Sequence, residues 1–185
     1  MSAALVPSAL RLLRRRAGAA YTAGALATAV NTVPDVLRQV LVWSSPSSAA
    51  ALAVDVVGFL TALVAQVWLV GALAALPDGG SWSARGALHR GTGLAVCAVR
   101  TAPGAVLAGV VTGGLVSALV TLPASVAALG WRSVLGPLGD PPVGAFAVAA
   151  VSDVVASALT LPYLALVVVL AARGLGGAGA GRGTA

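Results

Sequence analysis

The sequence contains no lysine, no glutamate and no isoleucine, and it has one cysteine and one histidine. Only 9% of its 185 residues are charged, whereas soluble domains carry about 25%. A domain folded in water needs more charge than this over its surface, which excludes an ordinary soluble protein. Cys97 alone excludes an internal disulfide. Cys97 and His89 together are also too few for a zinc site or a Cys–His–acid catalytic set, and we expect no cofactor and no metal.

Aromatic residues are scarce as well, at 4% of the chain. The 11 basic residues, all arginine, outnumber 5 acidic ones and give a net charge of +6. A nucleic-acid-binding surface would need a dense basic stripe interleaved with aromatic side chains. Here the arginines stand instead at the ends of apolar runs, so the sequence predicts no nucleic-acid partner.

Apolar residues make up 59% of the chain and gather in long runs. A helix that spans a bilayer needs about 20 such residues. Four segments have about this length, at residues 17–33, 51–76, 103–122 and 148–172, and the first could continue through Pro34 to Trp43. The sequence therefore predicts an all-α integral membrane protein with four transmembrane helices, in one domain over residues 1–174. The Gly-rich tail at 175–185 is expected to be disordered.

The placement of arginine predicts the orientation of these spans. Most basic residues fall on one side of the four segments: Arg11, Arg14, Arg15, Arg16, Arg85, Arg90, Arg100, Arg173 and Arg182. The link between the first two segments, WSSPSSAAA, carries no charge. Because arginine-rich ends stay in the cytoplasm, we expect both termini there. We also expect the first segment to be retained rather than cleaved as a signal peptide, because its apolar run continues to Val33.

Two stretches, residues 11–34 and 100–123, share one layout. A shift of 89 residues places Arg11 on Arg100, Gly24 on Gly113 and Pro34 on Pro123. Further along, VDVV at 54–57 matches SDVV at 152–155. The sequence therefore predicts two tandem helical hairpins, over about 5–76 and 83–174, related by an axis along the membrane normal.

Small residues recur every fourth position in the first and third segments. In lipid, acyl chains are as apolar as the helices, so the hydrophobic effect does not drive helix association. Helices associate instead through close van der Waals packing, which faces of small residues allow. We expect the first and third segments to pack against each other through these stripes. The predicted helix-packing residues are Ala20, Gly24, Thr28, Ala105, Gly109, Gly113 and Ser117.

Three prolines, Pro34, Pro123 and Pro162, are predicted to kink the spans that contain or end at them. After Pro34, apolar residues in DVLRQVLVW share one face, which predicts a short helix at the outer membrane interface. A basic amphipathic segment also precedes each hairpin: VPSALRLLRRR and SWSARGALHRGTGLAVCAVR. These two segments predict short interfacial helices that contact anionic lipid, or plain stop-transfer flanks. Gly86, Gly91 and Gly93 weaken the prediction of helix in the second of them.

Asp55 and Asp153 are the acidic residues within spans, and they occupy equivalent positions of the repeat. An ionisable group in a membrane is costly and marks a candidate polar site. The two aspartates either line a cavity open to the outside or act as interfacial caps near the outer ends of their helices. Asn31 and Gln66, the other strongly polar residues inside spans, favour interhelical hydrogen bonds.

The layout resembles the membrane domain found beside some bacterial glycerophosphodiester phosphodiesterases, and related small four-span membrane proteins. The resemblance rests on the basic segment before each hairpin and on the final span LPYLALVVVLAARG, which carries a proline and ends in arginine. It covers most of residues 5–174. It implies a fold and a location in the bacterial inner membrane, and it implies no activity, because no catalytic domain is attached.

Together these features predict a non-catalytic scaffold or partner-binding protein of the inner membrane, in contact with membrane lipids. The alternative is a small transporter or channel with Asp55 and Asp153 in its path. A homo-oligomer and a membrane-protein partner both remain open.

Overall fold

The computed structural model describes residues 5–131 and 140–174 of the chain, without the side chains of Asp35 and Arg38. Over these residues the protein is helical and has no β-strand. The helices, in chain order, are α1 (Leu5–Arg15), α2 (Ala17–Leu41), α3 (Ser48–Ala72), the short 3-10 helix η2 (Leu76–Asp78), α4 (Ala87–Thr101), α5 (Pro103–Leu129) and α7 (Val143–Ala172). The predicted all-α class is confirmed. The predicted disordered tail lies outside the described residues.

Local sequence explains several helix ends. Ser47 caps α3 by accepting a hydrogen bond from the backbone N–H of Ala50. Pro103 starts α5, where the missing N–H of proline costs nothing. Gly130 ends the same helix with a φ of 81°, a conformation that disfavours side chains with a Cβ.

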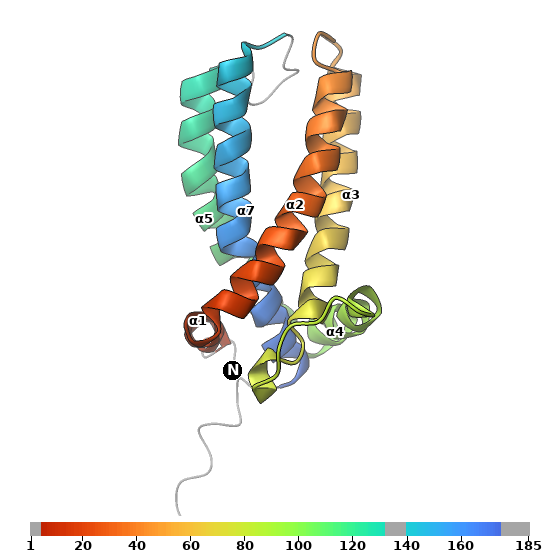
Figure 1. The fold of residues 1–185 in the computed structure, drawn as a ribbon, viewed down its shortest axis with the longest axis vertical. Helices are drawn as coiled ribbons and strands as arrows, with labels where there is room; N and C mark the ends of the chain where they lie inside the picture. Colours follow the sequence, from red (N-terminus) through yellow and green to blue (C-terminus); the bar gives the residue numbers. More distant parts are fainter. Residues whose placement is uncertain (1–4, 132–139, 175–185) are drawn as a thin grey trace, which may run out of the picture.

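The helices continue through all three prolines. Pro34 lies inside α2, Pro123 inside α5 and Pro162 inside α7. The prediction of a separate short helix after Pro34 is wrong, because α2 continues without a break to Leu41. A helix in apolar surroundings keeps its remaining backbone hydrogen bonds, since no water would replace them. Of the three helices, α7 visibly changes direction along its length (Figure 1).

The long helices form two pairs, α2 with α3 and α5 with α7 (Figure 1). One end, called here the loop end, holds the connection from α2 to α3, the end of α5 and the start of α7. At the other end, the arginine-rich end, α1, η2 and α4 lie and the two pairs converge. The most extensive helix interface is that of α5 with α7, followed by that of α3 with α4.

Both short basic segments are helical. In α1, Leu5, Ala9 and Leu13 are buried, and the helix packs mainly on α7. In α4, Ala87, Gly91 and Ala98 are buried, and the helix packs mainly on α3. The apolar faces of these helices thus contact protein, and each completes the core at the arginine-rich end.

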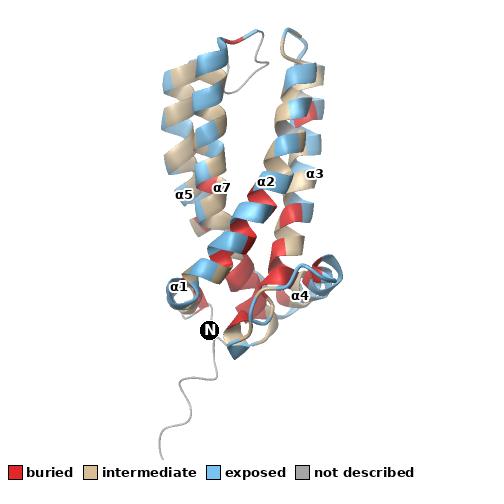
Figure 2. Ribbon diagram, in the orientation of Figure 1, coloured by how far each residue is buried: buried red, intermediate tan, exposed pale blue. Residues whose placement is uncertain are grey.

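Burial is concentrated at that same end, as Figure 2 shows. The largest fully buried side chains are Leu69, Leu73, Leu76, Leu166, Val70, Val167, Val169 and Pro162. Nearer the loop end, Val54 and Ala156 are buried, while large apolar side chains such as Leu119 (75% exposed) and Phe59 (68% exposed) are uncovered. Most of the buried core therefore lies at one end of the molecule, and the two helix pairs separate toward the other.

Among the described residues, three helices are long and apolar enough to cross a membrane: α3 with its continuation to Asp78, α5 and α7. Helix α2 is long enough, at 25 residues or about 38 Å. It falls short in apolarity, because Asn31, Asp35, Arg38 and Gln39 lie in its second half. The fold is compatible with a multi-pass membrane protein.

Candidate functional site

The predicted small-residue face of α2 is buried. Ala20 is fully buried and Thr28 is 3% exposed. A Cβ on Gly24 would collide with the ring of Pro162 on α7. This glycine therefore allows the close approach of α2 to Pro162 of α7.

The predicted face of α5 is also buried over most of its length. Ala105, Gly109 and Gly113 are buried and Ser117 is half-buried. A Cβ on Gly109 would lie 2.8 Å from Cγ1 of Val167 on α7, whereas one on Gly113 would meet no atom within 4 Å. Close packing on this stripe is thus concentrated at Ala105 and Gly109.

The predicted partner of these stripes is wrong. Helices α2 and α5 share no substantial interface in the described chain, and both pack on α7 instead. The physical reason is that a small-residue stripe allows close approach by any helix with a matching surface. Here α7 offers that surface on two sides, with Pro162 toward α2 and Val167 toward α5.

The closest helix crossing was not predicted. A Cβ on Gly71 of α3 would collide with the backbone of Ala87 and Gly91, and one on Gly91 of α4 would collide with the carbonyl of Val67. The two backbones therefore touch at a pair of glycines. From the sequence alone, Gly91 was interpreted as a residue that weakens the prediction of helix in this segment. The presence of one glycine near the end of the second span and another in the basic segment that follows could have indicated this contact.

Arginines fasten the loops around this crossing. The Arg90 guanidinium donates to the carbonyls of Gly71 (3.3 Å), Ser83 (3.0 Å) and Arg85 (2.6 Å). Arg173, which follows α7, pairs with Asp78 at 2.6 Å and also donates to the carbonyl of Ala74. These contacts satisfy carbonyls near the end of α3 and attach α4 and α7 to it.

Three polar oxygens lie buried near the point where the hairpins separate. Thr28 Oγ1, Asn31 Oδ1 and Gln66 Oε1 have no hydrogen-bond partner among the described residues. The Gln66 amide does donate to the carbonyl of Leu161 on α7, at 3.5 Å, so it links α3 and α7 as predicted. Since Gly24 contacts Pro162, Thr28 lies about one helical turn from this link. Buried oxygens of this kind can accept hydrogen bonds from water or from a polar ligand.

Asp55 and Asp153 occupy exposed positions on the loop-end halves of α3 and α7. Neither is without an interaction partner. Helix α7 begins at Val143, earlier than predicted, so Asp153 lies about 15 Å from its start and not at the helix end. That these two aspartates line one cavity stays a prediction.

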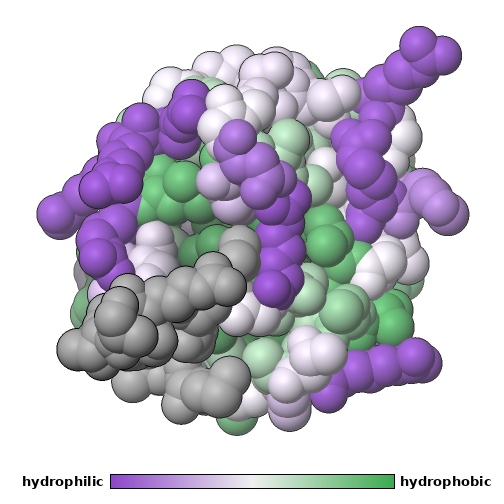
Figure 3. Space-filling model, turned by 90° about the horizontal axis from the view of Figure 1, so that it is seen from below, coloured by the Kyte–Doolittle hydropathy of each residue, from purple (hydrophilic) through white to green (hydrophobic). Residues whose placement is uncertain are grey.

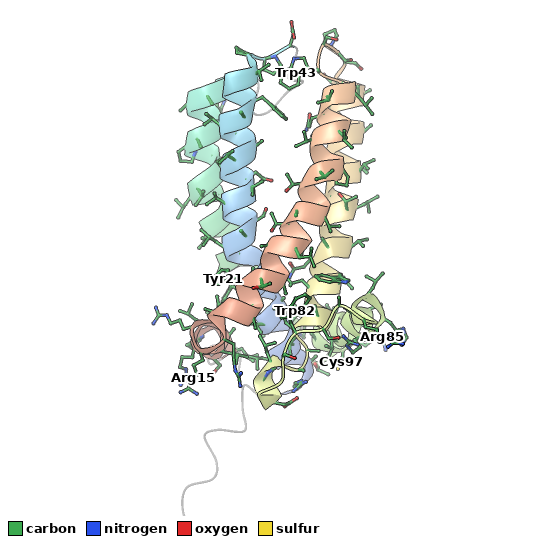
Figure 4. The ribbon with its side chains drawn as sticks, viewed as in Figure 1. Arg15, Tyr21, Trp43, Trp82, Arg85 and Cys97 are labelled. Atoms are coloured by element: carbon green, nitrogen blue, oxygen red, sulfur yellow. The ribbon has the colours of Figure 1, made fainter. Side chains whose placement is uncertain are left out.

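At the loop end, the two hairpins are tied together by Trp43, which Figure 4 shows between them. Its indole N–H donates to the Asp140 carboxylate at 2.9 Å, and its carbonyl accepts from the Asp140 N–H at 2.7 Å. Its ring also packs edge-on against Phe146, with centroids 4.8 Å apart. This contact stabilises Asp140 in a left-handed conformation with a φ of 57°.

No catalytic arrangement appears in residues 5–131 and 140–174. No group of three His, Cys, Asp or Glu side chains there could hold a metal ion. His89 is exposed on α4, and the Cys97 thiol donates to the carbonyl of Ala172 at 3.5 Å. In comparisons with known proteins, no family model, no curated protein and no solved structure matches this chain.

Proposed function

We propose that the protein is a non-catalytic, partner-binding scaffold of the bacterial inner membrane. In this proposal α2 is the fourth transmembrane helix, and both termini lie in the cytoplasm. The predicted orientation is part of this proposal. It is supported by the position of the helices that bear most arginines, which lie at one end of the bundle. The pairing of α2 with α3 along much of their length supports α2 as a span.

The order of the helices supports a tandem repeat of two hairpins. Each half has a short basic helix followed by two long helices, α1-α2-α3 and α4-α5-α7. The short helix of each half packs on the last helix of the other, α1 on α7 and α4 on α3. This reciprocal exchange joins the halves at the arginine-rich end.

The observation that carries the scaffold proposal is the uneven packing of the bundle. Its arginine-rich end has a closed core, whereas the loop-end halves of both hairpins present large apolar side chains outward. On α5, Leu115 and Leu119 are 59% and 75% exposed and lie one turn apart. Such a face fits the transmembrane helix of a membrane-protein partner.

Photo-crosslinking in living cells tests this proposal. A crosslinking residue in place of Leu119 is expected to give a protein adduct of one defined mass. The same residue in place of Leu107, which is 63% exposed near the other end of α5, should give lipid adducts only. The captured protein must also rebind the purified chain in nanodiscs, about tenfold more weakly when Leu115 and Leu119 are both alanine. Lipid adducts alone at both positions would contradict the scaffold proposal.

The second candidate function is a small transporter or channel. Two observations favour it: Asp55 and Asp153 are exposed in the loop-end halves of long apolar helices, and the unpartnered oxygens of Thr28, Asn31 and Gln66 lie deeper in the bundle. A membrane carboxylate is retained where a charge is needed. The Asp55→Asn/Asp153→Asn variant is then expected to keep its thermal stability but to fail to restore the growth of a deletion strain, which the unchanged protein restores. Asp140→Asn, which keeps an oxygen for Trp43, is the control. Restoration of growth by the double variant would remove the transporter candidate.

A further inference from the structure

We propose that α1 carries a binding site for the phosphate group of an anionic phospholipid, formed by Ser8, Arg11 and Arg15. The site rests on the membrane placement of the proposed function and not on its protein partner. It lies at the arginine-rich end of the bundle, beside the face of α1 that Leu5, Ala9 and Leu13 bury.

The site is a shallow pocket along one face of α1. Ser8, Arg11, Leu12 and Arg15 line it, and its volume is about 180 Å³. These positions are three or four residues apart, so they share one face of the helix. Leu5, Ala9 and Leu13 hold the remaining face in the core. The helix is thereby fixed in rotation, and the pocket stays on the surface.

The polar groups of the pocket are positioned before any ligand binds. The Arg11 guanidinium donates to Ser8 Oγ at 3.2 Å and to the carbonyl of Pro7 at 3.4 Å. Arg15 is exposed and has no polar partner among the described residues, and it points outward from the lower end of the bundle (Figure 4). A guanidinium donates up to five hydrogen bonds in a planar fork that suits phosphate oxygens.

Among residues 5–131 and 140–174, no acidic side chain is paired with an arginine of α1. Asp78 is the acidic residue of the arginine-rich end in the described chain, and Arg173 already occupies it. Arg16 and Arg90 donate to backbone carbonyls of other segments, those of Gly79 and Gly71, whereas the hydrogen bonds that Arg11 donates stay within α1. An anion is therefore favoured at Arg11 and Arg15.

The surroundings favour a lipid over a soluble phosphate. Viewed from the arginine-rich end, hydrophilic side chains surround exposed hydrophobic atoms (Figure 3). Leu12 forms part of the pocket wall, and the neighbouring Leu10 is 41% exposed. Only Arg16 separates α1 from the start of α2, which places α1 at the level of the headgroups when α2 spans the membrane. A phospholipid can put its phosphate on the arginines and its acyl chains on these leucines.

Native mass spectrometry of the full chain in detergent tests the site, with phosphatidylglycerol and phosphatidylcholine as probes. The protein is expected to bind phosphatidylglycerol more tightly. The Arg11→Gln/Arg15→Gln variant should bind it roughly 30-fold more weakly, because each guanidinium lost from the pocket removes charge-assisted hydrogen bonds to the phosphate, about a factor of five each. Ser8→Ala should give a smaller loss, since it leaves both charges and removes one partner of Arg11.

The matched control is Arg14→Gln/Arg100→Gln, which removes two exposed arginines outside the pocket. It should bind phosphatidylglycerol within about twofold of the unchanged protein, which identifies a site rather than bulk attraction. Equal losses in both double variants, or no preference for phosphatidylglycerol, would overturn the proposal. Complete competition by millimolar inorganic phosphate would also overturn it, because the ligand would then be a soluble phosphate. All variants should keep the thermal stability of the unchanged protein, and the crosslinking at Leu119 reports separately on the scaffold.

Discussion

Replacing Gly91 with alanine is expected to separate α4 from α3 and to lower the free energy of unfolding by about 3 kcal/mol. A Cβ at this position would collide with the Val67 carbonyl of α3, and it would also lie only 3.0 Å from the backbone nitrogen of Gly71. The obstacle is backbone within a helix, so it cannot rotate away as a side chain would. Thermal unfolding in detergent, followed by circular dichroism, measures the loss.

The control is Gly93→Ala, two residues further along the same helix. A Cβ there would meet no atom within 4 Å, and alanine is a better helix former than glycine by about 1 kcal/mol. This variant should therefore be as stable as the unchanged protein or more stable. If Gly91→Ala matched Gly93→Ala in stability, the glycine crossing of α3 and α4 would not exist as described.

Leu166→Ala is expected to lower the free energy of unfolding by about 2–5 kcal/mol, the range found for buried leucines. Leu166 is fully buried in α7, within the cluster to which α1, α2, α3 and α5 contribute. The loss comes from the cavity and from dispersion contacts, which lipid does not replace inside the bundle. The same unfolding measurement applies.

Leu159→Ala is the matched control, because Leu159 lies on the same helix and is 46% exposed. Its effect should stay within about 0.5 kcal/mol. Comparable losses at Leu159 and Leu166 would contradict the concentration of the core at the arginine-rich end.

The positions of the helices could be predicted from the sequence, because apolar runs and basic amphipathic segments are local patterns. The segments expected at residues 51–76, 103–122 and 148–172 correspond to α3, α5 and α7, and both short basic segments are helices. Helix ends were predicted less well. For the first segment, the sequence left open a separate helix after Pro34 and a continuation toward Trp43, and α2 follows the second, since it runs past Pro34 to Leu41.

Packing partners could not be predicted, because a stripe of small residues specifies a face without specifying its neighbour. Gly24 and Gly109 do lie at close contacts, but both contacts are with α7. Gly71 and Gly91 were missed for the opposite reason. A glycine in a helix is locally unfavourable, and its benefit appears only once a second backbone approaches it. The pocket on α1 likewise depends on which face of the helix α7 covers.

The packing of α1 on α7 has a consequence for biosynthesis. The ribosome completes α1 first and α7 after the other helices, yet Leu5, Ala9 and Leu13 have their main partner on α7. Until α7 is made, α1 lacks its main protein partner, and its smaller contacts with α2 and α5 leave much of its apolar side uncovered. Closure of the bundle at the arginine-rich end thus waits for α7, and a chain that stops short of α7 would leave the apolar side of α1 uncovered.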